Sequence, residues 1–428
     1  MSLREHASPL RVANFRYFFV GEVVNTAGSS MSGIALAFAV LRIDDSATAL
    51  GPVVAASTVP MVAFMLIGGA LADRLPRALV LRGCNLGPGA SSRAIVATLV
   101  LTDLAEIWHL VGLSFITGTV FAVSYPAFHG MVPILLPPEE RKSGFLLIDQ
   151  SDALLRIGGP VLSGIPVATV GAGWALAIDA ATYVVAAAFL GLVRLPFGER
   201  PERRTSVIGD FVVGWAFARQ LGWVIPASCC ALVFNALISG SIYVLGPVIA
   251  DDTIGSRGWG LAVSGRAVGL FVGTPVLVKI TIRRPMWVIM IGFAVMSTPM
   301  LLLGTRVNTA ALAVAFFIAG AAVSAPGLAW NLTVQEKVPE QMLSRIMAID
   351  GFFSFVAMPI GQVLVGPFSA QFGIRAVELG SVALCVPVMV VALSVPAIRD
   401  LRLVGPQPGS PGQDSTDVEE PERAGDVT

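Results

Sequence analysis

Twelve long apolar stretches dominate this sequence of 428 residues and limit what it can fold into. A helix needs about 20 mostly apolar residues to cross a bilayer. Charged residues make up only 13% of the chain, against about a quarter in soluble domains. These proportions exclude an ordinary soluble enzyme and predict an all-α membrane protein. The predicted spans are roughly 15–41, 47–71, 79–101, 107–135, 143–169, 174–194, 223–249, 259–280, 286–304, 309–334, 345–370 and 374–397.

The distribution of basic residues predicts the orientation of these spans. Cytoplasmic loops of membrane proteins carry an excess of Lys and Arg. If both termini are cytoplasmic, 21 of the 28 basic residues lie in or beside cytoplasmic segments. Four lie in the opposite loops (Arg42, Arg257, Arg306 and Arg375), and three lie within spans (Arg93, Arg156 and Arg266). We therefore expect a multi-pass protein of a bacterial cell membrane with both ends in the cytoplasm.

The chain divides into two halves that resemble each other. Val123-Ser-Tyr-Pro126 recurs as Val323-Ser-Ala-Pro326, an offset of about half the membrane portion. The predicted parts are a six-helix half (1–194), a cytoplasmic linker with an interfacial helix over Val207 to Trp223 (195–222), a second six-helix half (223–400) and a disordered tail (401–428). Two parallel six-span repeats are typical of transporters that bind substrate between the halves.

The loop between spans two and three carries a charged motif. It reads Gly69-Ala-Leu-Ala-Asp73-Arg74-Leu-Pro76-Arg77. Asp73 lies at the membrane surface, where it can pair with arginine or cap a helix, and the arginines anchor the loop to the inner leaflet. This loop resembles the hallmark loop of the major facilitator superfamily, although Pro76 stands where that family has a second glycine and Ala78 where it has a basic residue. The resemblance implies a cytoplasmic gate built on Gly69, Asp73, Arg74 and Arg77.

A glycine-proline element in the fifth span points to exporters within that superfamily. The residues are Gly158, Gly159, Pro160 and Gly164, which bend a helix and permit tight packing. They resemble the fifth-span motif of exporters. The widest resemblance, from Asn14-Phe-Arg16 through Ser124-Tyr-Pro126 to Gly171-Ala-Gly-Trp174, is to the enterobactin-exporter-like branch. It implies a proton-driven exporter of small molecules and leaves the substrate open.

Ionisable residues within the spans are candidates for proton coupling, because charge inside a bilayer is costly. Glu22 ranks first, since Asn25, Thr26 and Ser29 share its helical face and form a polar stripe. Burial disfavours a charged carboxylate, so Glu22 is a plausible proton carrier; the alternative is a glutamate hydrogen-bonded to a neighbouring helix. Further coupling candidates are Asp152, Arg156, Asp179 and Asp350, while Glu378 lies near a loop and is expected to be solvated.

Polar and aromatic residues in the spans are candidates for a drug-sized cavity, although each is individually more often a packing residue. The set comprises Asn25, Ser29, Phe38, Tyr125, Phe234, Tyr243, Trp330 and Phe353.

No enzyme motif accompanies these features. The sequence has no P-loop, H-E-x-x-H or G-x-S-x-G pattern, so neither catalysis, a metal nor a cofactor is expected. Its zero net charge argues against a nucleic-acid partner. We predict a monomeric twelve-helix secondary transporter in the bilayer that exports a hydrophobic or amphipathic small molecule (a drug, antibiotic or secondary metabolite) in exchange for protons. A siderophore-specific exporter, an importer of the same fold and, remotely, a non-transporting receptor or scaffold are the alternatives.

Overall fold

The computed structural model describes residues 8–72, 77–129, 131–193, 207–277, 282–305 and 307–403, and these contain helices and no strands. The helices form twelve long rods within this part of the chain, two of them broken by π-helical turns. The first six rods are α2 (Ala13–Ile43), α3 (Ala47–Ala72), α4–η2–α5 (Arg77–Cys84, Asn85–Gly89, Ala90–Leu101), α6 (Ile107–His129), α8 (Pro138–Thr169) and α9 (Ala172–Leu192).

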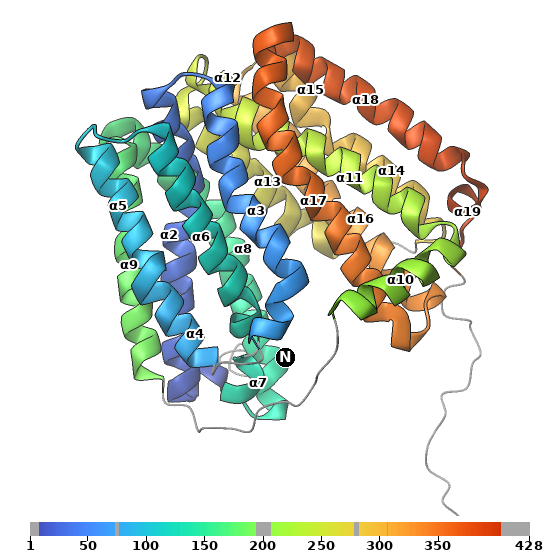
Figure 1. Cartoon of the computed structure of the whole chain (residues 1–428), viewed down its shortest axis with the longest axis horizontal. Coiled ribbons are helices and arrows are strands. Elements are labelled where there is room, and N and C mark those ends of the chain that lie inside the picture. The colour runs from blue at the N-terminus through green and yellow to red at the C-terminus, as the bar shows by residue number, and fades with distance from the viewer. Residues whose placement is uncertain are drawn as a thin grey trace, which may run out of the picture.

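The last six rods repeat this order. They are α11–η3–α12 (Val224–Gly240, Ser241–Leu245, Gly246–Asp251), α13 (Gly255–Leu277), α14–α15 (Pro285–Met296, Thr298–Thr305), α16 (Thr309–Lys337), α17 (Glu340–Phe372) and α18 (Ile374–Ser394). Four short helices complete the described chain: η1 (Ser8–Arg11), α7 (Val132–Leu135), α10 (Val207–Leu221) and α19 (Pro396–Arg399). Figure 1 shows the first six rods on one side and the last six on the other.

The twelve rods match the twelve stretches expected from hydropathy. Among the described residues, eight rods are long and apolar enough to cross a membrane by length and composition alone. The other four are α3, the broken third rod, α8 and α13. Asp149, Asp152 and Arg156 of α8 account for its lower apolarity. The chain is therefore an all-α, multi-pass membrane protein, and its described residues form twelve long rods.

The boundaries differ from the expected spans in three places. The stretch expected over 107–135 is divided between α6, which ends at His129, and α7, which begins at Val132. The fifth and eleventh rods begin at Pro138 and Glu340, before the apolar segments, because hydropathy detects only the membrane-crossing part of a helix. The helix expected over Val207 to Trp223 is present as α10.

The two sets of rods share backbone geometry as well as order. In the first set Gly171 precedes α9 with φ 95° and ψ 161°. In the second set Gly373 precedes α18 with φ 82° and ψ 145°. Only glycine readily adopts this region, so both copies use a glycine for the same sharp connection. The helices that follow are both 21 residues long, which extends the repeat found in the sequence.

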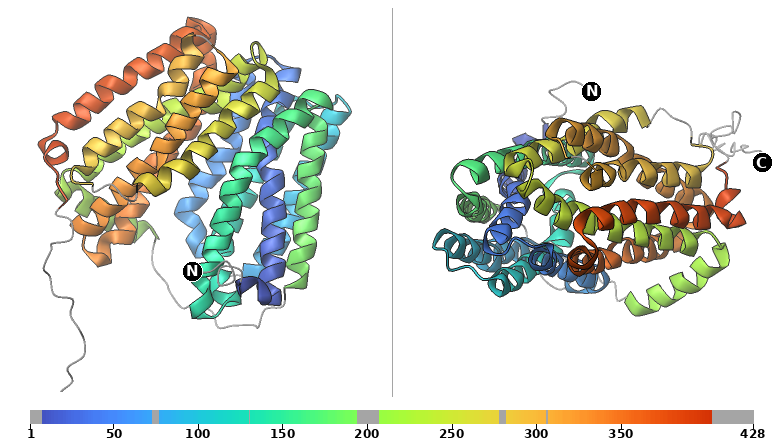
Figure 2. Two further views of the ribbon diagram at one scale, coloured as in Figure 1. Left: turned by 180° about the vertical axis from the view of Figure 1, so that it is seen from behind. Right: turned by 90° about the horizontal axis from the view of Figure 1, so that it is seen from above.

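The two sets pack together chiefly at one end. There the start of α3 contacts the end of α17, and the end of α8 contacts the start of α13. A Cβ on Gly51 would lie 2.3 Å from the Gln362 carbonyl oxygen, and one on Gly260 would lie 2.3 Å from the Pro160 carbonyl oxygen. Figure 1 and the left view of Figure 2 show the ribbons of the two sets diverging toward the opposite end.

The two left-handed glycines generate a stability prediction. We expect Gly171→Ala and Gly373→Ala each to cost about 1–3 kcal/mol of folding stability, because alanine is strained in this backbone region. The measurement is the apparent melting temperature of the purified protein in detergent. Gly33→Ala is the control, since a Cβ there meets no atom within 4 Å. Equal melting temperatures for all three variants would contradict the assigned geometry.

Candidate functional site

A polar stripe runs along α2, as the sequence predicts. The Thr26 hydroxyl donates a hydrogen bond of 3.3 Å to Glu22 Oε1. Glu22 is half-buried, and Asp152 of α8 lies close enough to interact with it electrostatically. The Asn25 side-chain oxygen is buried, and no hydrogen-bond partner is present for it in the described part of the chain. Glu22 therefore lies where α2 faces α8, in a partly polar interior.

The stripe continues from α2 to α9. Ser29 Oγ donates to the Tyr183 hydroxyl oxygen over 3.3 Å, and Tyr183 is buried. The two helices approach closely at Gly28, where a Cβ would lie 2.0 Å from Thr182 Oγ1 and 2.9 Å from Asp179 Oδ1. A side chain at position 28 would therefore separate α2 from the polar groups of α9.

A buried ion pair lies behind the stripe. Arg93 Nε of α5 is 2.6 Å from Asp179 Oδ2 of α9, and their side chains are 10% and 1% exposed. The Arg93 guanidinium carbon also lies 4.1 Å from the centre of the Tyr183 ring, a cation–π contact. Arg93 Nη1 donates to Thr117 Oγ1 of α6 over 3.3 Å. One arginine thus joins α5, α6 and α9.

A break in the third rod positions this arginine. Gly87 has a non-helical ψ of −106°, and Pro88 follows it inside the π-helical turn η2. At Gly89 a Cβ would lie 2.9 Å from the Tyr183 ring, so glycine is needed for α9 to pack here. Prolines and π-turns are recognised causes of helix kinks. The Gly87-Pro88-Gly89 sequence therefore redirects the rod shortly before Arg93.

Sequence patterns indicate only part of this network. They point to Glu22, Asn25, Ser29 and Asp179, but they do not identify Arg93 as the partner of Asp179 and give Tyr183 no role. The available signal was that Arg93 is one of only three basic residues placed inside spans. A carboxylate in another span of the same half, such as Asp179, would be the expected partner for this charge.

The remaining coupling and gate candidates are less fully described. Asp350 is half-buried on α17, and no ion pair involving it occurs among the described residues. Asp73 and Arg74 lie outside the described residues, as do the side chains of Arg77 and Arg156. Gly69 falls within α3. The gate assigned to this loop stays a prediction.

The fifth-span element packs against two helices. A Cβ on Gly159 would lie 2.0 Å from Ser30 Oγ of α2, and one on Gly164 would lie 2.8 Å from the Ser256 carbonyl oxygen of α13. Gly158 makes no such approach to another helix, and Pro160 lies inside α8. The element therefore joins the first set to the second at the end where they meet.

The aromatic cavity candidates do not form one cluster in the described structure. Phe38 is buried in the apolar core at the contacting end of the two sets. Phe234 stacks on Phe293 with ring centres 4.3 Å apart, and Trp330 meets the Trp223 ring at 5.4 Å.

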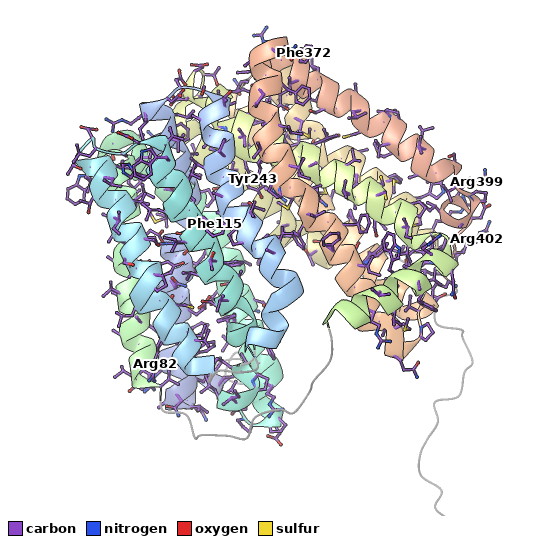
Figure 3. The ribbon with its side chains drawn as sticks, in the orientation of Figure 1. Arg82, Phe115, Tyr243, Phe372, Arg399 and Arg402 are labelled. Atoms are coloured by element: carbon purple, nitrogen blue, oxygen red, sulfur yellow. The ribbon has the colours of Figure 1, made fainter. Side chains whose placement is uncertain are left out.

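Two further aromatic candidates lie elsewhere. Phe353 stacks on Trp215 of α10 at 5.8 Å, whereas Tyr243 is 45% exposed (Figure 3). The side chain of Tyr125 is outside the described set. The substrate cavity therefore stays a prediction.

Glu378 corrects an expectation. Its position near a loop predicts a solvated side chain, but the side chain is fully buried. Its two carboxylate oxygens lie 2.9 and 2.6 Å from the hydroxyl of Ser241, which donates to them. Hydropathy placed Glu378 near the end of a span but carried no information on which helix covers it.

The comparisons with known proteins identify the family. The pattern of the family described as transmembrane secretion effectors, a branch of the major facilitator superfamily, matches residues 5–416. The chain belongs to this family. It is thus a member of a transporter family, and transporters of this kind are generally not enzymes.

Two curated relatives align with most of this chain. The multidrug efflux pump Tap of Mycolicibacterium fortuitum is 24% identical over 405 residues, which span 88% of this chain and 94% of that protein. The macrolide efflux protein A of Streptococcus pyogenes is 23% identical over 401 residues, spanning 91% and 97% of the two chains.

Solved structures share the fold. The nucleoside transporter NupG has a TM-score of 0.71 at 11% identity and covers 89% of this chain and 98% of its own. A bacterial homologue of the iron transporter ferroportin, solved in an inward-facing state, has a TM-score of 0.64 at 17% identity over 92% and 100% of the chains. At such identities the likeness supports the fold alone.

The buried ion pair generates a second prediction. We expect Arg93→Leu or Asp179→Leu alone to cost about 3–5 kcal/mol, because each leaves an unpaired buried charge. The double variant should lose much less than the sum, since it leaves neither charge. A double-mutant cycle of thermal stability in detergent measures this difference. Arg257→Leu, at an exposed residue, is the control, and additive losses would contradict the pairing.

Proposed function

We propose that the protein exports a hydrophobic or amphipathic small molecule in exchange for protons. The family supplies transport, and the names of the two efflux relatives support the outward direction and a drug-like substrate. Proton coupling is supported by the different surroundings of two carboxyl groups in the first set, Asp179 and Glu22. Asp179 has an arginine at 2.6 Å, whereas Glu22 has a hydroxyl and a nearby second carboxylate.

Glu22 is the proposed proton carrier. No basic side chain pairs with it in the described part of the chain, and Asp152 adds like charge beside it. A proton on Glu22 removes both the cost of partial burial and the repulsion. Asp179 has Arg93 beside it, which compensates its charge. In this division Asp179 and Arg93 hold the helices in place, while Glu22 changes charge during the transport cycle.

Alternating access is the proposed movement. Residues 1–194 and 223–400 are the two moving halves, joined by the linker 195–222. The described contacts between them, at Gly51, Gly164 and Gly260, lie at the end that the arginine distribution assigns to the outside. With both termini cytoplasmic, this conformation faces inward. Opening the outer end requires these close glycine contacts to separate while the loop at Asp73 closes the cytoplasmic side.

Transport in everted vesicles tests the coupling. We expect an imposed pH gradient, acidic inside, to drive accumulation of a lipophilic efflux substrate, and Glu22→Gln to abolish uphill accumulation by removing the proton site. Glu106→Gln is the control, because Glu106 is exposed at the end of the molecule away from Glu22. Accumulation that persists unchanged in Glu22→Gln would remove this residue from the mechanism. Movement only in the opposite direction would identify an importer.

The cytoplasmic gate has its own test. We expect Asp73→Asn to reduce the turnover rate several-fold while leaving substrate binding nearly unchanged, because the loop is assigned to the movement and not to the substrate. Initial rates in vesicles and equilibrium binding to the purified protein measure the two quantities separately. A variant with normal turnover, or with weakened binding alone, would refute the gate.

A further inference from the structure

Two arginine pairs meet at one end of the last six rods. Arg283 and Arg284 immediately precede α14, while Arg399 ends α19 and Arg402 follows it. All four side chains are exposed. We call these four residues the basic patch; Figure 3 shows Arg399 and Arg402 at the same edge of the molecule.

The backbone holds the two segments side by side. The Leu403 N–H donates to the Arg283 carbonyl oxygen over 3.1 Å, and α19 contacts α14. Ile398 is fully buried and anchors α19 to the apolar core of the last six rods. The arginines are therefore brought together by the fold, although more than a hundred residues separate them in the sequence.

Asp400 lies within the patch, but its one negative charge does not cancel the four positive charges. Arg399 Nε and Nη2 donate to the two oxygens of Asp400 at 3.1 and 3.2 Å. Hydrogen bonding from Arg399, with the nearby charges of Arg399, Arg402 and Arg284, holds the pKa of Asp400 below its ordinary value. Asp400 neutralises one arginine, and the patch retains an excess of positive charge.

The patch lies at the level of lipid headgroups. Arg284 is the residue before the candidate span Pro285–Thr305, and Arg399 follows the span Ile374–Ser394 by only five residues. Trp287 lies within one turn of Arg284 and is 37% exposed. Tryptophans of this kind concentrate at membrane–water interfaces, and guanidinium groups bind phosphate through paired N–H groups.

We propose that the basic patch is a binding site for the headgroup of an anionic phospholipid. The phosphate is held by Arg284 and Arg402, while Asp400 positions Arg399 beside them. The acyl chains lie along the exposed surface near Trp287. Arginine clusters next to the ends of membrane spans attract acidic lipids in this way. The site flanks α14 and α19, whereas Glu22 lies on α2, and it does not depend on the proposed substrate.

The acidic tail is the competing occupant. Residues 404–428 contain six carboxylates and one arginine and follow directly after Leu403. The lipid is favoured because the patch lies at headgroup depth beside an exposed tryptophan, whereas the first acidic residue of the tail is Asp414, eleven residues beyond Leu403. Both occupants are anionic, so the experiment must distinguish them.

Mass spectrometry of the intact purified protein measures lipid binding directly. The probes are phosphatidylglycerol and phosphatidylcholine with identical acyl chains. We expect the full chain to retain phosphatidylglycerol preferentially. Arg284→Gln/Arg402→Gln should reduce that preference by about tenfold or more, since each basic residue near a membrane surface contributes roughly a fivefold factor. Binding of phosphatidylcholine should not change.

Two matched proteins complete the test. Arg257→Gln/Arg375→Gln removes two exposed arginines outside the patch and should retain the preference for phosphatidylglycerol. A chain ending at Leu403 should bind phosphatidylglycerol as the full chain does. Loss of preference in the Arg257/Arg375 variant, or its retention in the Arg284/Arg402 variant, overturns the site. A preference that appears only after truncation assigns the patch to the acidic tail instead.

Discussion

Close approach of helix backbones at small residues is the interaction on which this arrangement depends. Lipid provides little hydrophobic drive for helices to associate, so packing and polar contacts must supply it. A Cβ on Gly118 of α6 would lie 2.1 Å from the Ser57 carbonyl oxygen of α3, and one on Gly269 of α13 would lie 2.0 Å from the Phe317 carbonyl oxygen of α16. These are equivalent helix pairs in the two sets. Glycines also allow close backbone contact between the two sets, at Gly51 and Gly260. Packing within each set and packing between the sets therefore both depend on glycine having no side chain.

Polar chemistry is distributed much less evenly than this packing. In the first set, Arg93, Asp179 and Tyr183 form a compensated network behind α2, and Glu22 lies beyond it without an arginine among the described residues. In the second set, the fully buried carboxyl group is Glu378, held by Ser241. A compensated pair fixes helices in place, whereas an uncompensated group can exchange a proton as its surroundings change. This contrast is the physical basis for assigning structure to one carboxyl group and coupling to another.

The sequence predicted the twelve helices, their order and the repeat, because membrane helices are identified by long apolar stretches and basic flanks. It also predicted the stripe of Glu22, Asn25 and Ser29, since one helical face follows from spacing alone. It did not predict the Arg93–Asp179 pair or the burial of Glu378, because these depend on which helices become neighbours. The aromatic candidates do not form one cluster for the same reason. Phe234 stacks on a ring within the last six rods, and Phe353 stacks on a ring of α10. The spacing of residues along the sequence predicts which side chains share a helix face, but only the packing of the helices determines which side chains of other helices that face contacts.

Gly171 and Gly373 occupy equivalent places and adopt nearly the same backbone angles, although few side chains around them correspond. The two sets are therefore alike in the backbone geometry of this connection but unlike in their buried charged groups. In the proposed mechanism, a change in charge at Glu22 acts directly on the first set, and the second set follows through the contacts between the two sets, among them the close approaches at Gly51 and Gly260.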